Sequence, residues 1–140
     1  MGTVRAAAVN FEIRPCSRWE QFEAHVTDLV CESVELGADL VVLPELISLE
    51  LVQMQPNLSP KEMVPFIAEF WNDYVSLMEG LATGCGIALV GGSTFDKDRQ
   101  NVSPICFPSQ ENQFQPKVAL TQWEIEEFGC KPGEELTLCR

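Results

Sequence analysis

The chain has 140 residues, enough for one domain with a hydrophobic core, and 46% of them are hydrophobic against 21% charged. Nine basic and 21 acidic residues give a net charge of −12, which argues against nucleic acid and anionic membrane surfaces as partners. No apolar stretch approaches the ~20 residues of a membrane span and the chain starts without an apolar signal region, so we expect a cytoplasmic protein.

The first half of the sequence predicts alternating strands and helices. Apolar runs at 4–9 and 40–43 are expected to form strands, the second buried on both faces. Between them, Ser17 and Glu20 have the spacing of a capping box that starts a helix. Gly37 is placed to end that helix in a left-handed conformation. We expect the strand at 4–9 to be buried as well.

A second helical region begins at 59–62, which repeats the helix-start signature with proline at the first helical position. Apolar residues then continue at helical spacing over 66–81. Pro65 lies inside this helix and predicts a kink or restart, because proline removes a backbone donor. Gly84 is expected to close the helix, and 87–90 forms the next buried strand.

The remaining sequence predicts two strands, 102–107 and 114–118, paired across a polar turn, and 136–139 could begin another. Strands that alternate with helices indicate an α/β fold whose sheet starts out mainly parallel. No internal repeat, low-complexity tract or linker divides the chain. We therefore expect one domain, or part of one, over residues 1–140.

Two charged residues stand at positions that favour chemistry. Glu45 follows the predicted strand 40–43 after Pro44, and ligands of α/β sheets collect at the carboxyl ends of strands. A carboxylate there can lose part of its hydration and serve as a general base. Glu45 could equally begin the next helix and favour its dipole, and Lys117 taken alone would be an ordinary surface lysine.

Four segments occur in the order and approximate spacing of the nitrilase (carbon–nitrogen hydrolase) superfamily, which the chain resembles. They are Val-Arg-Ala-Ala-Ala-Val at 4–9, Gly-Ala-Asp-Leu-Val-Val-Leu-Pro-Glu at 37–45, Leu-Val-Gly-Gly-Ser at 89–93, and the stretch 117–133. Asn101 also lies where the superfamily often has an asparagine. The resemblance covers nearly all of this chain but about the N-terminal half of a family domain. It implies a nitrilase-like α-β-β-α sandwich of which 1–140 is the N-terminal half, truncated before the strand that carries the nucleophile.

The resemblance also implies roles for three residues. Glu45 would be the general base that takes the proton of a catalytic thiol. Lys117 would stabilise the tetrahedral intermediate on an amide or nitrile carbon, since a fixed positive charge favours developing negative charge. Glu124 would be an additional glutamate that orients the site, although it could equally be a solvated acid beside Glu126 and Glu127. Complete members hydrolyse non-peptide amides or nitriles with a Glu-Lys-Cys triad, without metal or organic cofactor.

The nucleophile is where the sequence departs from the family pattern. In the superfamily the cysteine lies well beyond the Pro-Gly pair that Pro132-Gly133 resembles, and Cys139 is too close to that pair. Cys130 lies among acids, which disfavour a thiolate. A metal site is not expected either, because no Cys-x-x-Cys pair is present and His25 is the single histidine. We expect His25 to be exposed on a helix flank.

Two hypotheses follow. The first is a truncated or split carbon–nitrogen hydrolase that acts on a small amide or nitrile once a Cys-bearing C-terminal half completes it. The second is a non-catalytic interaction or assembly module that retains half of the fold. Under either hypothesis we expect a homo-oligomer or a complex with a complementing half, because half a sandwich leaves an apolar sheet face and an unpaired edge.

Overall fold

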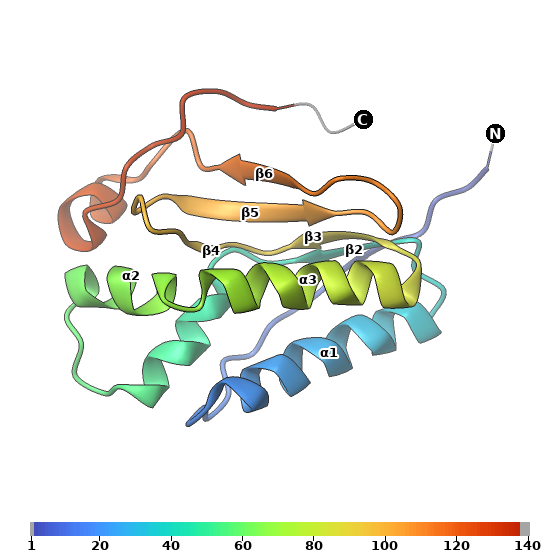
Figure 1. Cartoon of the computed structure of the whole chain (residues 1–140), viewed down its shortest axis with the longest axis horizontal. Coiled ribbons are helices and arrows are strands. Elements are labelled where there is room, and N and C mark those ends of the chain that lie inside the picture. Colours follow the sequence, from blue (N-terminus) through green and yellow to red (C-terminus); the bar gives the residue numbers. More distant parts are fainter. Residues whose placement is uncertain (1, 138–140) are drawn as a thin grey trace.

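Residues 2–137 are described by a computed structural model, and within them six strands form one mixed sheet with helices on one face (Figure 1). The strands are β1 (Ala6–Ala8), β2 (Leu40–Leu43), β3 (Ala88–Gly91), β4 (Thr94–Phe95), β5 (Asn101–Cys106) and β6 (Gln113–Pro116). The helices are α1 (Trp19–Glu35), the 3₁₀ helix η1 (Ile47–Met54), α2 (Pro60–Ala68), α3 (Trp71–Cys85) and the short π-type turn η2 (Glu124–Phe128). The α/β class expected from the sequence is confirmed.

The sheet changes direction in its middle. β1, β2 and β3 are parallel neighbours, linked first by α1 and then by η1, α2 and α3. β5 runs antiparallel to both β3 and β4, and β6 pairs antiparallel with the other side of β5. Figure 1 shows α1 and α3 lying together against one face of this sheet. The pairing of the strands at 101–106 and 113–116 agrees with the predicted strand pair.

The strand register defines the face that the helices cover. Ala7, Val41, Leu89 and Cys106 stand opposite one another across four strands. Val41, Leu89 and Cys106 are fully buried against apolar side chains of α1 and α3. Those helix residues are Phe22, Val26, Val30, Tyr74, Met78 and Ala82. The main hydrophobic core therefore lies between this row and the two long helices, as the helical apolar stripes predicted.

The opposite face of the sheet is less covered, and we call it the open face. Its side chains alternate with the buried row and are half-buried or exposed. They are Ala6, Ala8, Leu40, Val42, Ala88, Val90, Ser103 and Ile105. The expectation that 40–43 is buried on both faces is therefore wrong for this part of the chain, because α1 and α3 cover one face only. The run is apolar on both faces all the same, as in a strand that lies between two layers.

Two expectations about the N-terminal elements need correction. β1 is an edge strand with no neighbouring strand on its outer side among the described residues, and its Ala6 and Ala8 are exposed because they lie on the open face. α1 begins at Trp19, and Ser17 bonds Gln21 instead of forming a capping box with Glu20. The Gln21 side chain reaches back to the Ser17 backbone N–H at 2.8 Å. The Gln21 side chain, of the same length as Glu20 and one residue further on, thus takes the place predicted for Glu20.

The predicted long helix is two helices. The capping box at its start is confirmed, with the Ser59 N–H donating to Glu62 Oε2 at 2.8 Å. Pro65 stays inside α2, and the break falls instead between α2 and α3. Because Pro65 has no N–H for the Lys61 carbonyl, that oxygen is free to accept from Arg99 Nη2 at 3.3 Å. Gly86, with φ of 67°, closes α3 in place of Gly84.

The last described residues run beside β6 without forming a strand. Gln115 accepts the Thr137 N–H at 2.8 Å and donates to the Glu135 carbonyl at 3.1 Å. The predicted strand at 136–139 is therefore absent over its first two residues, and its remainder lies outside the described residues. Within 2–137, no helix is both long enough and apolar enough to cross a bilayer.

Candidate functional site

Glu45 follows β2 in a tightly constrained turn. The next residue, Leu46, has a left-handed backbone with φ of 54°, which is strained for a branched side chain. Its N–H donates to Ser93 Oγ at 2.9 Å and ties the turn to the loop after β3. In that loop Gly92 has φ of 65°, and a Cβ there would lie 2.5 Å from the Pro44 carbonyl oxygen. Only glycine lets the two chain segments approach this closely, so the turn presents Glu45 at the carboxyl end of the strand.

Lys117 is the first residue after β6 and continues the alternation of side chains along that strand. Its N–H donates to the Asn101 carbonyl at 2.8 Å, and its own carbonyl accepts the Gly133 N–H at 2.8 Å. The backbone is thus held from both sides. Because side chains alternate along a strand, Gln113, Gln115 and Lys117 project to the same side. Gln113 pairs with Ile105 of the open face, so the lysine belongs to that face.

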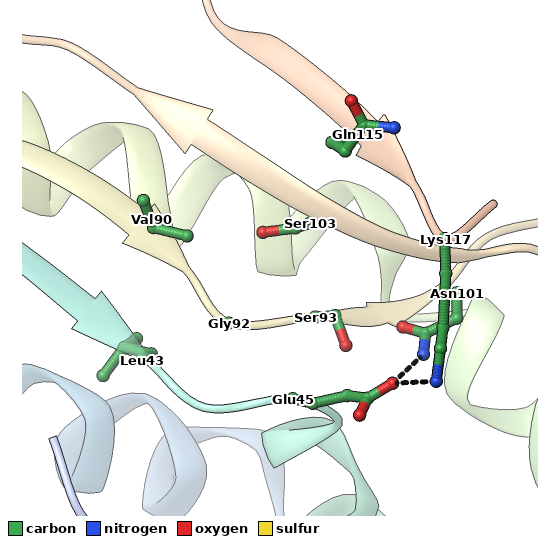
Figure 2. A pocket seen from close by; sticks show the side chains of 9 residues that line it. All are labelled: Leu43, Glu45, Val90, Gly92, Ser93, Asn101, Ser103, Gln115 and Lys117. Atoms are coloured by element: carbon green, nitrogen blue, oxygen red, sulfur yellow. Dashed lines mark hydrogen bonds and ion pairs between the residues drawn. The ribbon is translucent and has the colours of Figure 1, made fainter. Parts of the chain in front are cut away.

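The structure brings Glu45, Lys117 and Glu124 into one cluster. Lys117 Nζ lies 2.9 Å from Glu45 Oε1 and 2.9 Å from each carboxylate oxygen of Glu124. Figure 2 shows the lysine reaching down from the end of β6 to the Glu45 carboxylate. The Glu124 side chain is 6% exposed, that of Lys117 30% and that of Glu45 54%. The three residues named from the sequence therefore meet at one point, with Glu124 on the inside.

Glu124 is fixed by its own short turn. The Thr121 N–H and hydroxyl both donate to Glu124 Oε2, at 2.8 and 2.9 Å. Glu126 and Glu127 are exposed, so the interpretation as a solvated acid fits these neighbours and not Glu124. Thr121 was missed as a site residue. Its signal was the Thr-x-x-Glu spacing, which is typical of a capping box.

Asn101 also belongs to the cluster. Its Nδ2 donates to Glu45 Oε1 at 2.7 Å and to Glu124 Oε1 at 3.4 Å, and the residue is 2% exposed. The resemblance to the superfamily had pointed to an asparagine at this position, but it gave the side chain no role. The placement of Asn101 at the start of β5 sets its amide between two acids that are distant in sequence.

The cluster keeps Lys117 and Glu124 charged. Burial by itself would lower the pKa of Lys117, but hydrogen bonds and charge interactions with Glu45 and Glu124 outweigh it, so this pKa lies above its usual value. Burial would likewise raise the pKa of Glu124, yet hydrogen bonds from Thr121 and Lys117 hold it below its usual value. Both groups therefore carry full charge at neutral pH. Glu45 lacks the expected loss of hydration here, because its side chain is more than half exposed.

A pocket of about 350 Å³ adjoins the cluster. It is lined by Leu43, Glu45, Val90, Gly92, Ser93, Asn101, Ser103, Gln115 and Lys117 (Figure 2). The apolar part comes from the ends of β2 and β3, and the polar part from β5, β6 and the two loops. Val90 and Ser103 are side chains of the open face, so this hollow lies on the side of the sheet away from α1 and α3.

None of the cysteines among residues 2–137 lines this pocket. Cys130 packs beside Phe128, and burial, with the Glu124 charge, raises the pKa of its thiol to about 11. Burial raises the pKa of Cys106, on the helix-covered face, to about 11 as well. Cys139 lies outside the described residues. Over the described part of the chain, no group of three or more His, Cys, Asp or Glu side chains is arranged to hold a metal ion.

His25 is not exposed, contrary to expectation. The side chain is 5% exposed, and Nδ1 lies 3.1 and 3.0 Å from the two oxygens of the fully buried Glu50 carboxylate. The Arg14 N–H also donates to Glu50, at 2.9 Å, and the Phe11 ring lies 4.5 Å from the imidazole. The helix flank that carries His25 faces η1, a contact that the helical pattern of α1 alone did not reveal. The pair joins α1 to η1 and takes no part in the Lys117 cluster.

Comparison with known proteins agrees with this architecture. The chain is 25% identical over 136 residues to the probable hydrolase YhcX of Bacillus subtilis (strain 168), covering 95% of this chain and 26% of that protein. A carbon–nitrogen hydrolase from Helicobacter pylori G27 superposes with a TM-score of 0.71 at 18% identity, covering 94% of this chain and 45% of the other. An amidase from Nesterenkonia sp. superposes with a TM-score of 0.70 at 24% identity, covering 94% and 49%. No protein-family model matches the chain.

The chain thus spans about a quarter of this curated relative and about half of each of these two solved chains. The superpositions show a common fold, and they confirm the resemblance noted in the sequence. The protein has the fold of about half of a carbon–nitrogen hydrolase of the nitrilase superfamily.

Proposed function

We propose that the chain provides the base and the cation of a carbon–nitrogen hydrolase that acts on small amides or nitriles. The observation that carries this proposal is the position of Lys117 Nζ, 2.9 Å from the carboxylates of both Glu45 and Glu124 beside a small pocket. Such a site combines a carboxylate with access to solvent and a cation that stays protonated. These are the two groups that thiol-dependent amide hydrolysis needs in addition to the thiol.

In this proposal Glu45 takes the proton from a thiol, and the thiolate attacks the amide carbon. Lys117 stabilises the negative charge that develops on the amide oxygen, and Glu124 holds the lysine in place. The protonated Glu45 then gives its proton to the leaving amine, and a thioester remains. Water attacks the thioester with Glu45 again acting as base, which releases the carboxylic acid and restores the thiol. No metal or organic cofactor takes part in these steps.

The thiol is proposed to come from a second layer that covers the open face. The open face is largely apolar, and the pocket opens on it. Ser103 Oγ and Gln113 Oε1, on the same side, have no hydrogen-bond partner within residues 2–137. In a mutant of the amidase from Nesterenkonia sp. AN1, which is 23% identical to this chain and 51% covered by it, acrylamide has undergone Michael addition at the active-site cysteine. The five described cysteines are free thiols, which suits the reducing cytoplasm in which we place the protein.

The test is ammonia release from simple aliphatic amides and nitriles. The 140-residue chain alone is expected to be inactive, and the chain joined to a Cys-bearing C-terminal half to be active. In the active form, Glu45→Gln and Lys117→Met should each lower kcat/KM by about 10³-fold or more. Lys97→Met is the matched control on the exposed surface and should retain activity. An active complex that tolerates Lys117→Met would contradict the proposal.

The second candidate function is a non-catalytic interaction or assembly module. Its support is that no described cysteine lines the pocket, while an apolar open face is available for association. Tight self-association of the 140-residue chain, with no Cys-bearing companion in the cell, would favour this candidate. Co-purification of a companion that restores ammonia release would favour the hydrolase.

A further inference from the structure

We propose that Asn101 is the positioning residue of this site, which holds the carboxylates of Glu45 and Glu124 together on Lys117. This role deepens the proposed function, and the part that Asn101 would play in catalysis rests on that function. The side-chain Nδ2 donates to Glu45 Oε1 at 2.7 Å and to Glu124 Oε1 at 3.4 Å. The main-chain carbonyl accepts the Lys117 N–H at 2.8 Å. Asn101 is therefore bonded to every member of the cluster.

The chemistry of the neighbours sets the direction of the Asn101 amide. Carboxylate oxygens only accept, so the NH₂ group must face Glu45 and Glu124, and the oxygen must face away from them. Figure 2 shows the amide nitrogen of Asn101, and not its oxygen, directed at the Glu45 carboxylate. A residue with a neutral donor of this size is needed at the position. Aspartate has the same shape but would bring a third negative charge to two acids that share one cation.

The arrangement is unfavourable for Asn101 itself. Its Oδ1 is buried and has no hydrogen-bond partner among residues 2–137. A buried acceptor without a partner costs free energy, and an apolar side chain of similar shape would avoid that cost. The contacts of Nδ2 with the two carboxylates explain why a polar side chain occupies the position. Asn101 thus serves the geometry of the charges around Lys117 more than the stability of the sheet.

The test is the pH titration of the Lys117 ammonium by NMR in lysine-labelled protein, with Lys61, Lys97 and Lys131 as internal references. In the Asn101→Leu variant, Glu45 loses its amide donor and moves off the lysine, so the Lys117 midpoint should fall by about half a pH unit or more. Asn72→Ala on the exposed surface of α3 is the matched control and should leave the midpoint unchanged. In the completed enzyme, Asn101→Leu should lower kcat about tenfold or more with a smaller change in KM.

The outcomes separate this inference from the proposed function. Loss of the Lys117 shift with a retained thermal midpoint supports a positioning role. An unchanged Lys117 midpoint in Asn101→Leu overturns it, whatever the activity. If Asn101→Leu does not fold, Asn101→Ala takes its place, and unfolding of both variants overturns the proposal in favour of a structural role. Absence of ammonia release from the completed protein refutes the hydrolase function and leaves the titration result standing.

Discussion

Lys117 Nζ and Glu45 Oε1 lie 2.9 Å apart although 72 residues separate them in sequence. The contact depends on three pieces of backbone. The Leu46 turn presents the glutamate, the Asn101 carbonyl holds the lysine N–H, and Gly92 lets the two loops approach. Each piece lies in a different part of the chain. The ion pair therefore forms because the sheet brings these segments together, and no local motif could form it alone.

Acid should weaken the fold through Glu124. Its pKa lies below the usual value of 4.5, so the unfolded chain binds the proton more tightly than the folded one. The stabilisation by Glu124 is therefore fully present above pH 4.5 and is lost as pH falls through the lower folded-state pKa. Denaturant unfolding between pH 3 and 7 should show a shallower acid loss in Glu124→Gln than in the wild type. Glu127→Gln, an exposed neighbour, should keep the wild-type slope.

Gly92→Ala should destabilise the protein and displace Glu45. The new Cβ would lie 2.5 Å from the Pro44 carbonyl oxygen, at a backbone φ of 65° that alanine disfavours. We expect a loss of about 2 kcal/mol or more in the free energy of unfolding. Gly80→Ala in α3 is the matched control, because nothing lies within 4 Å of its new Cβ. It should stabilise by roughly 0.5–1 kcal/mol, and similar effects at both sites would contradict the clash.

Breaking the buried pair between His25 and Glu50 should be costly. His25→Leu leaves the Glu50 carboxylate 1% exposed with the Arg14 N–H as its remaining partner, so about 3 kcal/mol should be lost. The double variant His25→Leu/Glu50→Leu should recover a large part of this loss, since no charge stays buried. Urea unfolding of the two single variants and the double variant measures the coupling. Additive losses would show that the two side chains do not interact.

The open face should drive association. Val42 lies at its centre, half-buried beside Val90, and a charged side chain there should oppose contact with another layer. We expect the wild-type chain to be dimeric or larger at micromolar concentration by light scattering. Val42→Lys should shift it toward monomer, while Ser76→Lys on exposed α3 should not. A monodisperse wild-type monomer with cooperative unfolding would mean that these residues close a core of their own.

Short sequence signals predicted several of the elements of the fold correctly. The capping box at 59–62 and the glycine stop at Gly37 each depend on residues a few positions apart, and both appear as predicted. The apolar strand at 40–43 also forms, although only one of its faces is covered by helices. Where a nearby residue competed for the same role, the prediction failed. Gln21 replaced Glu20, and Gly86 replaced Gly84, because spacing alone does not rank neighbouring candidates.

By itself, the sequence determined the alternation of the main strands and helices, although not β4, η1, η2 or the division into α2 and α3, and by resemblance it named Glu45, Lys117 and Glu124. The tertiary structure decided that Glu124 is buried while its acidic neighbours are exposed, and that Asn101 joins the cluster. It also decided which sheet face the helices cover. The physical reason is that backbone preferences act over a few residues, whereas burial and charge pairing depend on which distant segments meet in the sheet. Which strands become neighbours is settled by the pairing of the whole sheet, here β1-β2-β3-β5-β4 with β6 on β5, and no single local pattern fixes that order.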